Sequence, residues 1–222
     1  MNQPFNAIAK NYNLLNDFLS LGLHRVWKKT LVEAMSEELE KNDRVLDLAT
    51  GTGDVAHLFL GKLSSSQVFA ADPCEAMMEQ GKRKYNGLTQ WLRAEAEALP
   101  FPDGFFSLIT CSFGVRNFRD RSIAFQEIAR TLVPRGKFGI LEIHPIPTGW
   151  KYLPLRLFWK FGVPLWGRGV RQLRAYEYLR DTAARFISPE DMVEELKPFF
   201  DVKRKESLIG GGLVTLIIAE KR

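Results

Sequence analysis

Glycines and carboxylates alternate around the first long apolar run of the chain. Gly51 and Gly53 follow residues 45–48. Asp47 and Asp54 stand on either side of this turn. Glycine lets a loop turn tightly and approach a ligand closely, and carboxylates beside it accept hydrogen bonds or attract cations. The spacing predicts a nucleotide-like ligand held by a strand, a turn and a helix.

Two kinds of ligand compete for such a loop. Gly51, Gly53 and Ala56 satisfy a dinucleotide fingerprint. A pyrophosphate, however, would lie over the start of the helix, where we expect the Asp54 carboxylate to repel it. S-adenosylmethionine carries a sulfonium cation and no phosphate, and opposite charges about 4 Å apart attract by roughly 4 kcal/mol at an effective dielectric of 20. The sequence therefore favours S-adenosylmethionine as the cofactor.

Two further acids follow the next apolar runs. Asp72 ends the run 68–71, where a carboxylate can accept hydrogen bonds from both ribose hydroxyls. Glu95 follows the third run, at the place where the adenine amino group would be read. Together with the glycine turn, these acids predict an adenosine-binding cleft.

Elements that alternate between strand-like and helix-like patterns must position these residues. Five apolar runs are separated by helix-like stretches: "RVLDLAT", "QVFAAD", "TQWLRA", "FFSLITCS" and "KFGILEIH". Alternation of this kind predicts an α/β fold with a mainly parallel sheet and helices on both faces. The closing "FFDVKRKES" and "LVTLIIAEKR" flank a glycine-rich turn and predict an antiparallel hairpin. The expected sheet is mixed and seven-stranded.

Two segments lie outside this alternation. Residues 1–40 include a helix-like stretch and predict a helical lid, and residues 144–188 interrupt the pattern after the fifth strand. Ligands of open parallel sheets lie at the carboxyl ends of the strands, so the second segment is placed to cover a pocket. We expect one domain, residues 1–222.

Composition narrows the setting. The chain carries a net charge of +5, and its basic excess lies between His144 and Arg185, with eight Lys or Arg against two acids. Two cysteines without a His cluster, and no apolar leader, predict a cytoplasmic protein without a structural metal. Because the charge is confined to one apolar segment, a nucleic-acid partner is not predicted.

The basic segment 150–174 allows three interpretations. Charged residues and prolines interrupt it too often for it to span a bilayer. It is predicted to be a lid over the substrate pocket, a peripheral contact with the inner face of a membrane, or a helix packed on the core or on a second copy of the chain in a homodimer. The first two are compatible.

Several motifs together resemble one family. The motifs are "VLDLATGTGD", "AEALPF", "SFGVRNF" and "RTLVPRGKFGILE", with the opening "FNAIAKNYNLLNDFLSLGLHRVWKK". The glycine loop is similar to class I S-adenosylmethionine-dependent methyltransferases in general. "FGVRN" joined to "LSLGLHRVWK" resembles, over essentially the whole chain, the UbiE/MenG C-methyltransferases of menaquinone and ubiquinone biosynthesis.

The resemblance implies a Rossmann-like fold and transfer of a methyl group to a ring carbon of a prenylated hydroquinone. Demethylmenaquinol is the preferred substrate; the benzoquinol of ubiquinone biosynthesis, or a cofactor-binding partner without catalysis, are the alternatives. Carried over by position, the cofactor site would comprise Asp47, Ala49, Thr50, Gly51, Thr52, Gly53, Asp72, Pro73, Glu95, Ala96 and Ser112. Arg116, Asn117 and Tyr12 would lie near the substrate. Departures stand at Asn13, Glu95 and "LEIHPIP".

Methylation of a quinol ring carbon requires an electron-rich nucleophile. A phenol has a pKa near 10, and its phenolate places charge on the ortho carbon. We expect the Arg116 guanidinium to stabilise that oxyanion and Asn117 to orient it. His144 is a candidate base for the ring proton; His24, or a water held by Arg116, are alternatives, and a structural role for either histidine is also open.

Overall fold

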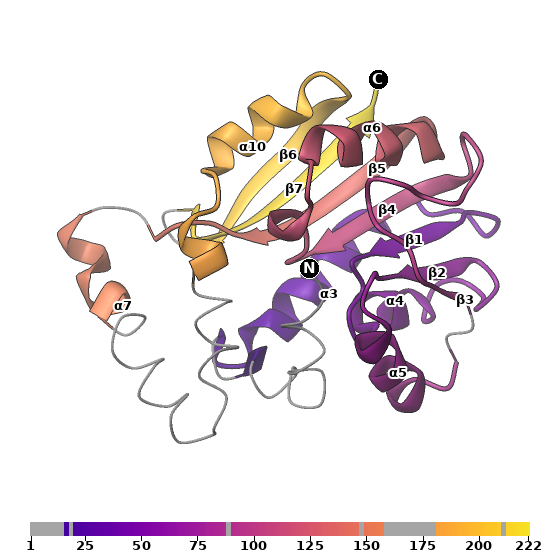
Figure 1. The fold of residues 1–222 in the computed structure, drawn as a ribbon, viewed down its shortest axis with the longest axis horizontal. Coiled ribbons are helices and arrows are strands. Elements are labelled where there is room, and N and C mark those ends of the chain that lie inside the picture. The colour runs from indigo at the N-terminus through magenta and orange to yellow at the C-terminus, as the bar shows by residue number, and fades with distance from the viewer. Residues whose placement is uncertain (1–15, 18–19, 88–89, 147–148, 158–180, 210–211) are drawn as a thin grey trace.

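A computed structural model describes residues 16–17, 20–87, 90–146, 149–157, 181–209 and 212–222 of the 222-residue chain (Figure 1). Tyr12 and Asn13 of the expected lid lie outside these residues. The basic segment 150–174 also lies outside them from residue 158 onward. Among the described helices, none combines the length and the apolar character needed to cross a membrane.

One seven-stranded sheet has the order β3-β2-β1-β4-β5-β7-β6. Its strands are β1 Val45–Leu48, β2 Val68–Ala71, β3 Gln90–Leu92, β4 Phe106–Ser112, β5 Leu132–Ile143, β6 Phe200–Ile209 and β7 Val214–Lys221. Pairs among β1 to β5 are parallel, whereas β7 runs antiparallel to both β5 and β6. The predicted mixed sheet with a closing hairpin is confirmed.

Helices cover both faces of this sheet (Figure 1). The helices described are α3 Leu23–Met35, α4 Asp54–Phe59, α5 Glu75–Lys84, α6 Arg121–Thr131, α7 Leu153–Leu157 and α10 Pro189–Leu196, with 3₁₀ turns η2 Val115–Asn117 and η3 Trp150–Tyr152. α6 and α10 lie on one face, and α3 and α4 pack together on the other. The predicted Rossmann-like arrangement is confirmed.

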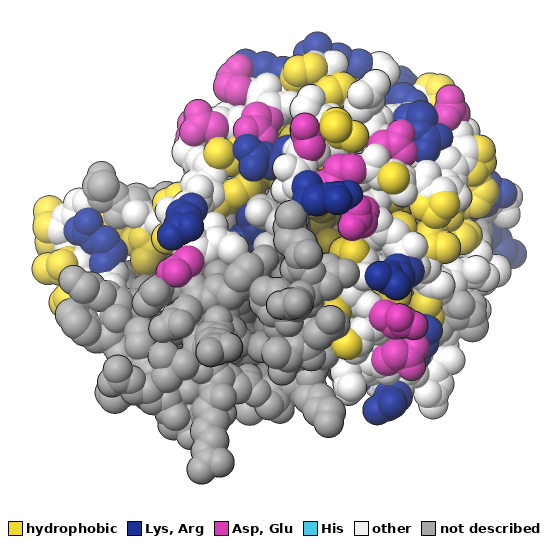
Figure 2. Space-filling view, viewed as in Figure 1, with side chains coloured by type: hydrophobic (Ala, Val, Ile, Leu, Met, Phe, Trp, Pro, Cys, Tyr) yellow, Lys and Arg dark blue, Asp and Glu magenta, His cyan; other side chains and the backbone are white. Residues whose placement is uncertain are grey.

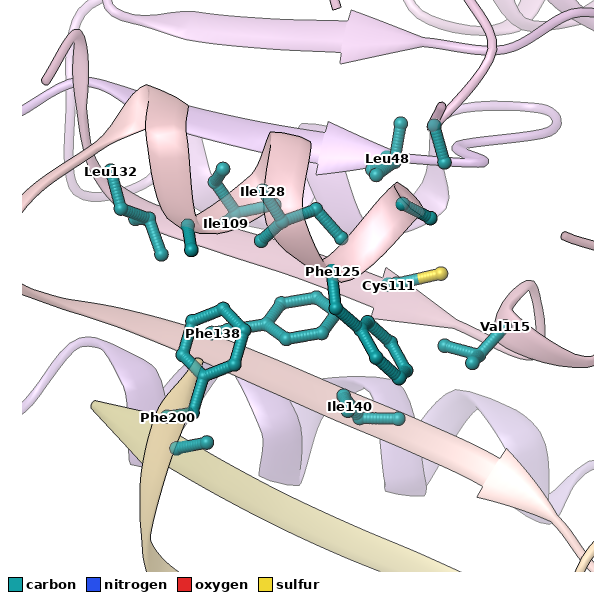
Figure 3. Close-up of a cluster of buried hydrophobic side chains, with 14 of the residues drawn as sticks. Leu48, Ile109, Cys111, Val115, Phe125, Ile128, Leu132, Phe138, Ile140 and Phe200 are labelled. Atoms are coloured by element: carbon teal, nitrogen blue, oxygen red, sulfur yellow. The ribbon is translucent and has the colours of Figure 1, made fainter. Parts of the chain in front are cut away.

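Side chains alternate along β5 to fill both layers of the core. Phe138 and Ile140 pack toward α6, where Phe125 and Phe200 complete an aromatic cluster (Figure 3). Leu141 belongs to the opposite cluster. Burial of each such side chain contributes about 1.5–3 kcal/mol, so the middle of the sheet is a rigid support for the strand ends.

Helix α3 packs against β5 of the sheet. A Cβ at Gly139 would lie 2.6 Å from Met35 Sδ and 3.0 Å from Leu31 Cδ1, so the glycine leaves room for these two side chains of α3. The N-terminal region therefore contributes a helix to the core.

Candidate active site

A cleft of about 830 Å³, counted with the open space at its mouth, lies at the carboxyl ends of β1, β2 and β4. It is lined by Leu48, Ala49, Gly51, Asp72, Pro73, Cys74, Met77, Ala94, Glu95, Ala96, Glu97, Ser112, Phe113, Gly114, Asn117, Phe118 and Arg119. This is the edge of the sheet where the sequence predicts the ligand.

The glycine turn between β1 and α4 is held from behind by Asp47. The carboxylate accepts hydrogen bonds from Thr50 Oγ1 at 2.5 Å, Thr110 Oγ1 at 3.1 Å and the Ala56 amide at 3.2 Å. Burial raises the pKa of Asp47 to about 6. Asp47 is not among the residues that line the cleft, so it shapes the loop from inside the protein.

Glycine is required in this turn for two reasons. Gly51 and Gly53 have φ values of 58° and 79°, in the left-handed region that L side chains avoid. A Cβ at Gly53 would also lie 2.5 Å from the Trp91 ring. The turn therefore stays narrow and leaves its front face to a ligand.

Asp72 lies at the front of the cleft, at the end of β2. Its Oδ2 accepts the Gly51 amide at 2.8 Å, and its Oδ1 accepts the Cys74 amide at 2.7 Å. Burial raises the pKa of this carboxyl above its usual value. Each carboxylate oxygen has a second acceptor position, so Asp72 can still receive the two hydroxyls of a ribose.

Apolar residues and an ion pair surround the other end of the cofactor region. Met77, Ala94 and Ala96 offer apolar surface to a flat base. Glu95 pairs with Arg119 at the exposed rim. The residues present thus fit the adenosine part of S-adenosylmethionine, with Asp72 at the ribose and the apolar wall at the adenine.

The turn after β4 forms the opposite wall. Ser112, Gly114 and Asn117 line the cleft, while Arg116 points into the protein with its side chain 5% exposed. The Arg116 guanidinium forms an ion pair with Glu142 of β5, which sequence analysis did not single out. This partner lies 26 residues away in sequence, so the pair forms only when β4 and β5 lie side by side.

Both candidate basic histidines are buried. His144 is 1% exposed; its Nδ1 is 2.8 Å from the Ile187 carbonyl, and its Nε2 is 2.7 Å from Thr215 Oγ1. Burial lowers the pKa of His144. His24, 4% exposed, has a pKa lowered to about 4 by burial and by Lys28. Neither side chain lines the cleft.

The structure corrects the reason given for excluding a phosphate. Asp54 pairs with Lys28 and Lys84, both at 2.8 Å, and it lies outside the cleft. Although burial raises the pKa of Asp54, the two lysines lower it well below its usual range. Because long-range partners neutralise this carboxylate, it does not repel a ligand as the sequence suggested.

Of the residues expected at the cofactor and substrate, eight line the cleft. They are Ala49, Gly51, Asp72, Pro73, Glu95, Ala96, Ser112 and Asn117. Asp47, Thr50, Thr52, Gly53, Arg116 and His144 do not line it, and Tyr12 lies outside the described residues. Phe113, Phe118 and Arg119 were missed, although Phe113 begins the quoted "FGVRN" and Phe118 and Arg119 follow it directly. No group of three or more His, Cys, Asp or Glu side chains suited to a metal occurs within the described ranges.

The sheet is parallel except for β7 and carries a glycine turn after β1 and an acid, Asp72, after β2. This combination is typical of Rossmann-like S-adenosylmethionine-dependent methyltransferases. Solved structures share this fold: a possible histamine N-methyltransferase from Thermotoga maritima (TM-score 0.65, 19% identity, 99% and 98% of the two chains covered) and the PH0226 protein from Pyrococcus horikoshii (0.64, 18%, 90% and 92%).

The chain belongs to the ubiE/COQ5 methyltransferase family, which it matches over residues 1–220. A demethylmenaquinone methyltransferase from Thermus thermophilus is 38% identical over 84% of this chain and 86% of its own length. A ubiquinone/menaquinone biosynthesis C-methyltransferase UbiE from Francisella philomiragia is 34% identical over 98% and 89%. The resemblance seen in the sequence motifs is confirmed.

Proposed function

We propose that this enzyme methylates a ring carbon of a prenylated hydroquinone, with demethylmenaquinol as the acceptor. The cleft carries this proposal, because one continuous space joins the adenosine end at Asp72 to the polar turn at Asn117. The relatives named above support the quinol as the acceptor class. The benzoquinol of ubiquinone biosynthesis is the alternative acceptor, since the second relative is named for both pathways.

At the adenosine end, the chain binds the adenosine part of S-adenosylmethionine and orients it. Asp72 accepts the ribose hydroxyls, Met77 and Ala96 flank the adenine, and Gly51 allows close backbone approach. Bound there, S-adenosylmethionine supplies an electrophilic methyl group on a sulfonium. Orientation of two reactants in one cleft is worth roughly 7–11 kcal/mol in favourable cases, so positioning supplies much of the rate.

At the acceptor end, Asn117 is the polar side chain of the 115–117 turn that lines the cleft, and it orients the quinol oxygen. Arg116 contributes from behind the turn, where its charge favours the phenolate over the phenol. Ser112 lies at the end of β4, between the two ends. Proton removal is assigned to water, because both ring nitrogens of His144 are engaged.

A peripheral membrane contact on the cytoplasmic side is part of the proposal. Trp150 is 88% exposed, and Leu153 and Leu157 are about half exposed beside Lys151 and Arg156. Apolar and basic side chains together suit an anionic lipid surface. Figure 2 has acidic and basic side chains interspersed over the described part of its face, a pattern that does not favour nucleic acid. Co-flotation of the protein with anionic vesicles tests the membrane contact. If the same surface forms a homodimer instead, the molecular mass measured in solution will rise with protein concentration.

Methyl transfer tests the central proposal. The assay follows labelled methyl from S-adenosylmethionine to short-chain reduced demethylmenaquinone, with a reduced benzoquinone analogue in parallel. We expect turnover with the naphthoquinol and binding of S-adenosylhomocysteine by calorimetry. Binding of the cofactor without turnover on either quinol would instead support a non-catalytic partner. Tight NADH binding with indifference to S-adenosylhomocysteine would contradict the cofactor.

Arg116→Ala tests the division between the two ends of the cleft. We expect kcat to fall roughly 100- to 1,000-fold while affinity for S-adenosylhomocysteine stays close to wild type, because Arg116 lies outside the adenosine end. Equal loss of both quantities would contradict this role.

A further inference from the structure

Glu142 is a carboxylate where the fold calls for an apolar side chain. It is the second-last residue of β5, it is 0% exposed, and it follows buried Ile140 and Leu141. Removing a charge from water costs several kcal/mol, and an apolar pair of similar volume often gives equal or greater stability than a buried ion pair. The stability of the sheet therefore does not explain a carboxylate at this position.

Glu142 accepts hydrogen bonds from both the side chain and the main chain of one residue in the turn after β4, Arg116. Its Oε1 accepts the Arg116 guanidinium and the Ile143 amide, the latter at 2.9 Å. Its Oε2 accepts the Arg116 amide at 3.3 Å. One buried carboxylate thus holds both the side chain and the main chain of Arg116.

The turn that Glu142 holds is strained. Phe113 has a left-handed φ of 59°, which costs a bulky residue on the order of 1–3 kcal/mol and persists only where the surroundings impose it. The Phe113 amide donates to the Leu141 carbonyl at 2.7 Å. Leu141 and Glu142, neighbours on β5, therefore impose the conformation of residues 113–117 together.

Residues on either side of the anchored Arg116 face the ligand. Gly114 and Asn117 line the cleft, whereas Glu142 does not. We propose that Glu142 is a positioning residue for methyl transfer: it holds Arg116 and thereby places Asn117 at the acceptor end of the cleft. This inference rests on the proposed function and adds a residue that acts only through Arg116.

Glu142→Gln is the direct test, because it keeps the shape and one acceptor oxygen but removes the charge. We expect kcat to fall at least about tenfold, with the KM for the quinol and the affinity for S-adenosylhomocysteine within about threefold of wild type. The matched control is Glu195→Gln, which removes a carboxylate paired with Arg121 at 2.5 Å outside the cleft. The control should keep wild-type kcat.

A double-mutant cycle separates positioning from a general structural role. In an Arg116→Met background, Glu142→Gln should lower kcat no further, because the charge pair is already gone and the glutamine oxygen can still accept the amide of residue 116. Should Glu142→Gln alone fail to fold, Arg116→Met/Glu142→Met places two apolar side chains in the site, and its kcat should equal that of Arg116→Met.

Two results would overturn the inference: wild-type kcat in Glu142→Gln, or losses in kcat that add in the double variant. A wild-type protein that methylates no quinol contradicts the proposed function instead, so the two failures are distinguishable.

Discussion

Carboxylates hold both ends of the cleft, but through different partners. At the cofactor end, Asp47 and Asp72 accept hydrogen bonds from nearby backbone amides and hydroxyls. At the acceptor end, Glu142 holds a charged side chain from another element. Backbone amides offer a fixed geometry. The acceptor end depends instead on the buried ion pair between Glu142 and Arg116, and removal of either charge leaves the other buried without a counter-charge.

The two ends should therefore respond differently to substitution. Substitutions at the cofactor end should alter local binding, because each carboxylate there shapes one loop. At the acceptor end, the Glu142 carboxylate holds a strained turn. Small changes there should lower kcat while the affinity for the cofactor stays the same.

Asp54→Asn should lower the free energy of unfolding by about 3 kcal/mol, because it leaves Lys28 buried without its carboxylate. Urea unfolding measures this. Lys28→Met/Asp54→Leu, which removes both charges, should recover most of the loss. Because Asp54 lies outside the cleft, the variant should gain no affinity for NADH; such a gain would restore the electrostatic argument made from sequence.

Asp72→Asn should weaken S-adenosylhomocysteine binding about 100-fold, equivalent to about 2.7 kcal/mol, because an amide accepts fewer hydrogen bonds than a carboxylate. Calorimetry measures the affinity. The control is Asp103→Asn, which changes an exposed carboxylate paired with Arg130. This variant should bind S-adenosylhomocysteine as the wild type does. Unchanged affinity in Asp72→Asn would move the ribose site elsewhere.

Gly114→Ala should disturb both ends at once. Its Cβ would lie 2.6 Å from Ala49 Cβ and 2.7 Å from Cys111 Sγ, at the contact between the glycine turn and the acceptor turn. Overpacking of this kind costs about 1–3 kcal/mol, to be measured as the free energy of unfolding. Adding Ala49→Gly should recover part of it, since residue 49 has a φ of 54° that glycine adopts freely. No recovery would mean that the turns do not press on each other.

The smallest effect expected is a pH dependence from His24. The folded protein binds a proton at His24 only near pH 4, whereas the usual pKa is 6.5, so protonation of the unfolded chain lowers stability as the pH falls from about 6.5 toward 4. Between pH 7 and 5.5 this amounts to about 1 kcal/mol. The stability of wild type relative to His24→Gln should fall by that amount.

Comparison with His24→Gln isolates this histidine. The raised pKa of Asp47 acts in the opposite direction between pH 3.8 and about 6, but it is common to both proteins and cancels. A constant difference between wild type and variant across this range would contradict the burial of a neutral His24.

Local motifs were enough to predict the fold and to place Asp72 and Gly51 at one cleft. Strand β2 and Asp72 are adjacent in sequence, and so are β1 and the glycine turn, so spacing alone reports their geometry. The acceptor end depends on pairs distant in sequence. Arg116 meets Glu142, and Asp54 meets Lys28, only once the sheet and helices are assembled. Spacing along the chain carries no record of such pairs, which explains why the partners of Asp54 and Arg116 were not predicted.

The position of β7 in the sheet has a consequence for how the protein is made. This strand, last in sequence among the seven, lies between β5 and β6 and supplies Thr215 to His144, 71 residues away in sequence. During synthesis, β5 with its buried carboxylate has an open edge until residues 214–221 leave the ribosome. The glycine turn can therefore form before β7 is made, whereas the edge of β5 beside Glu142 is covered only once β7 pairs with it.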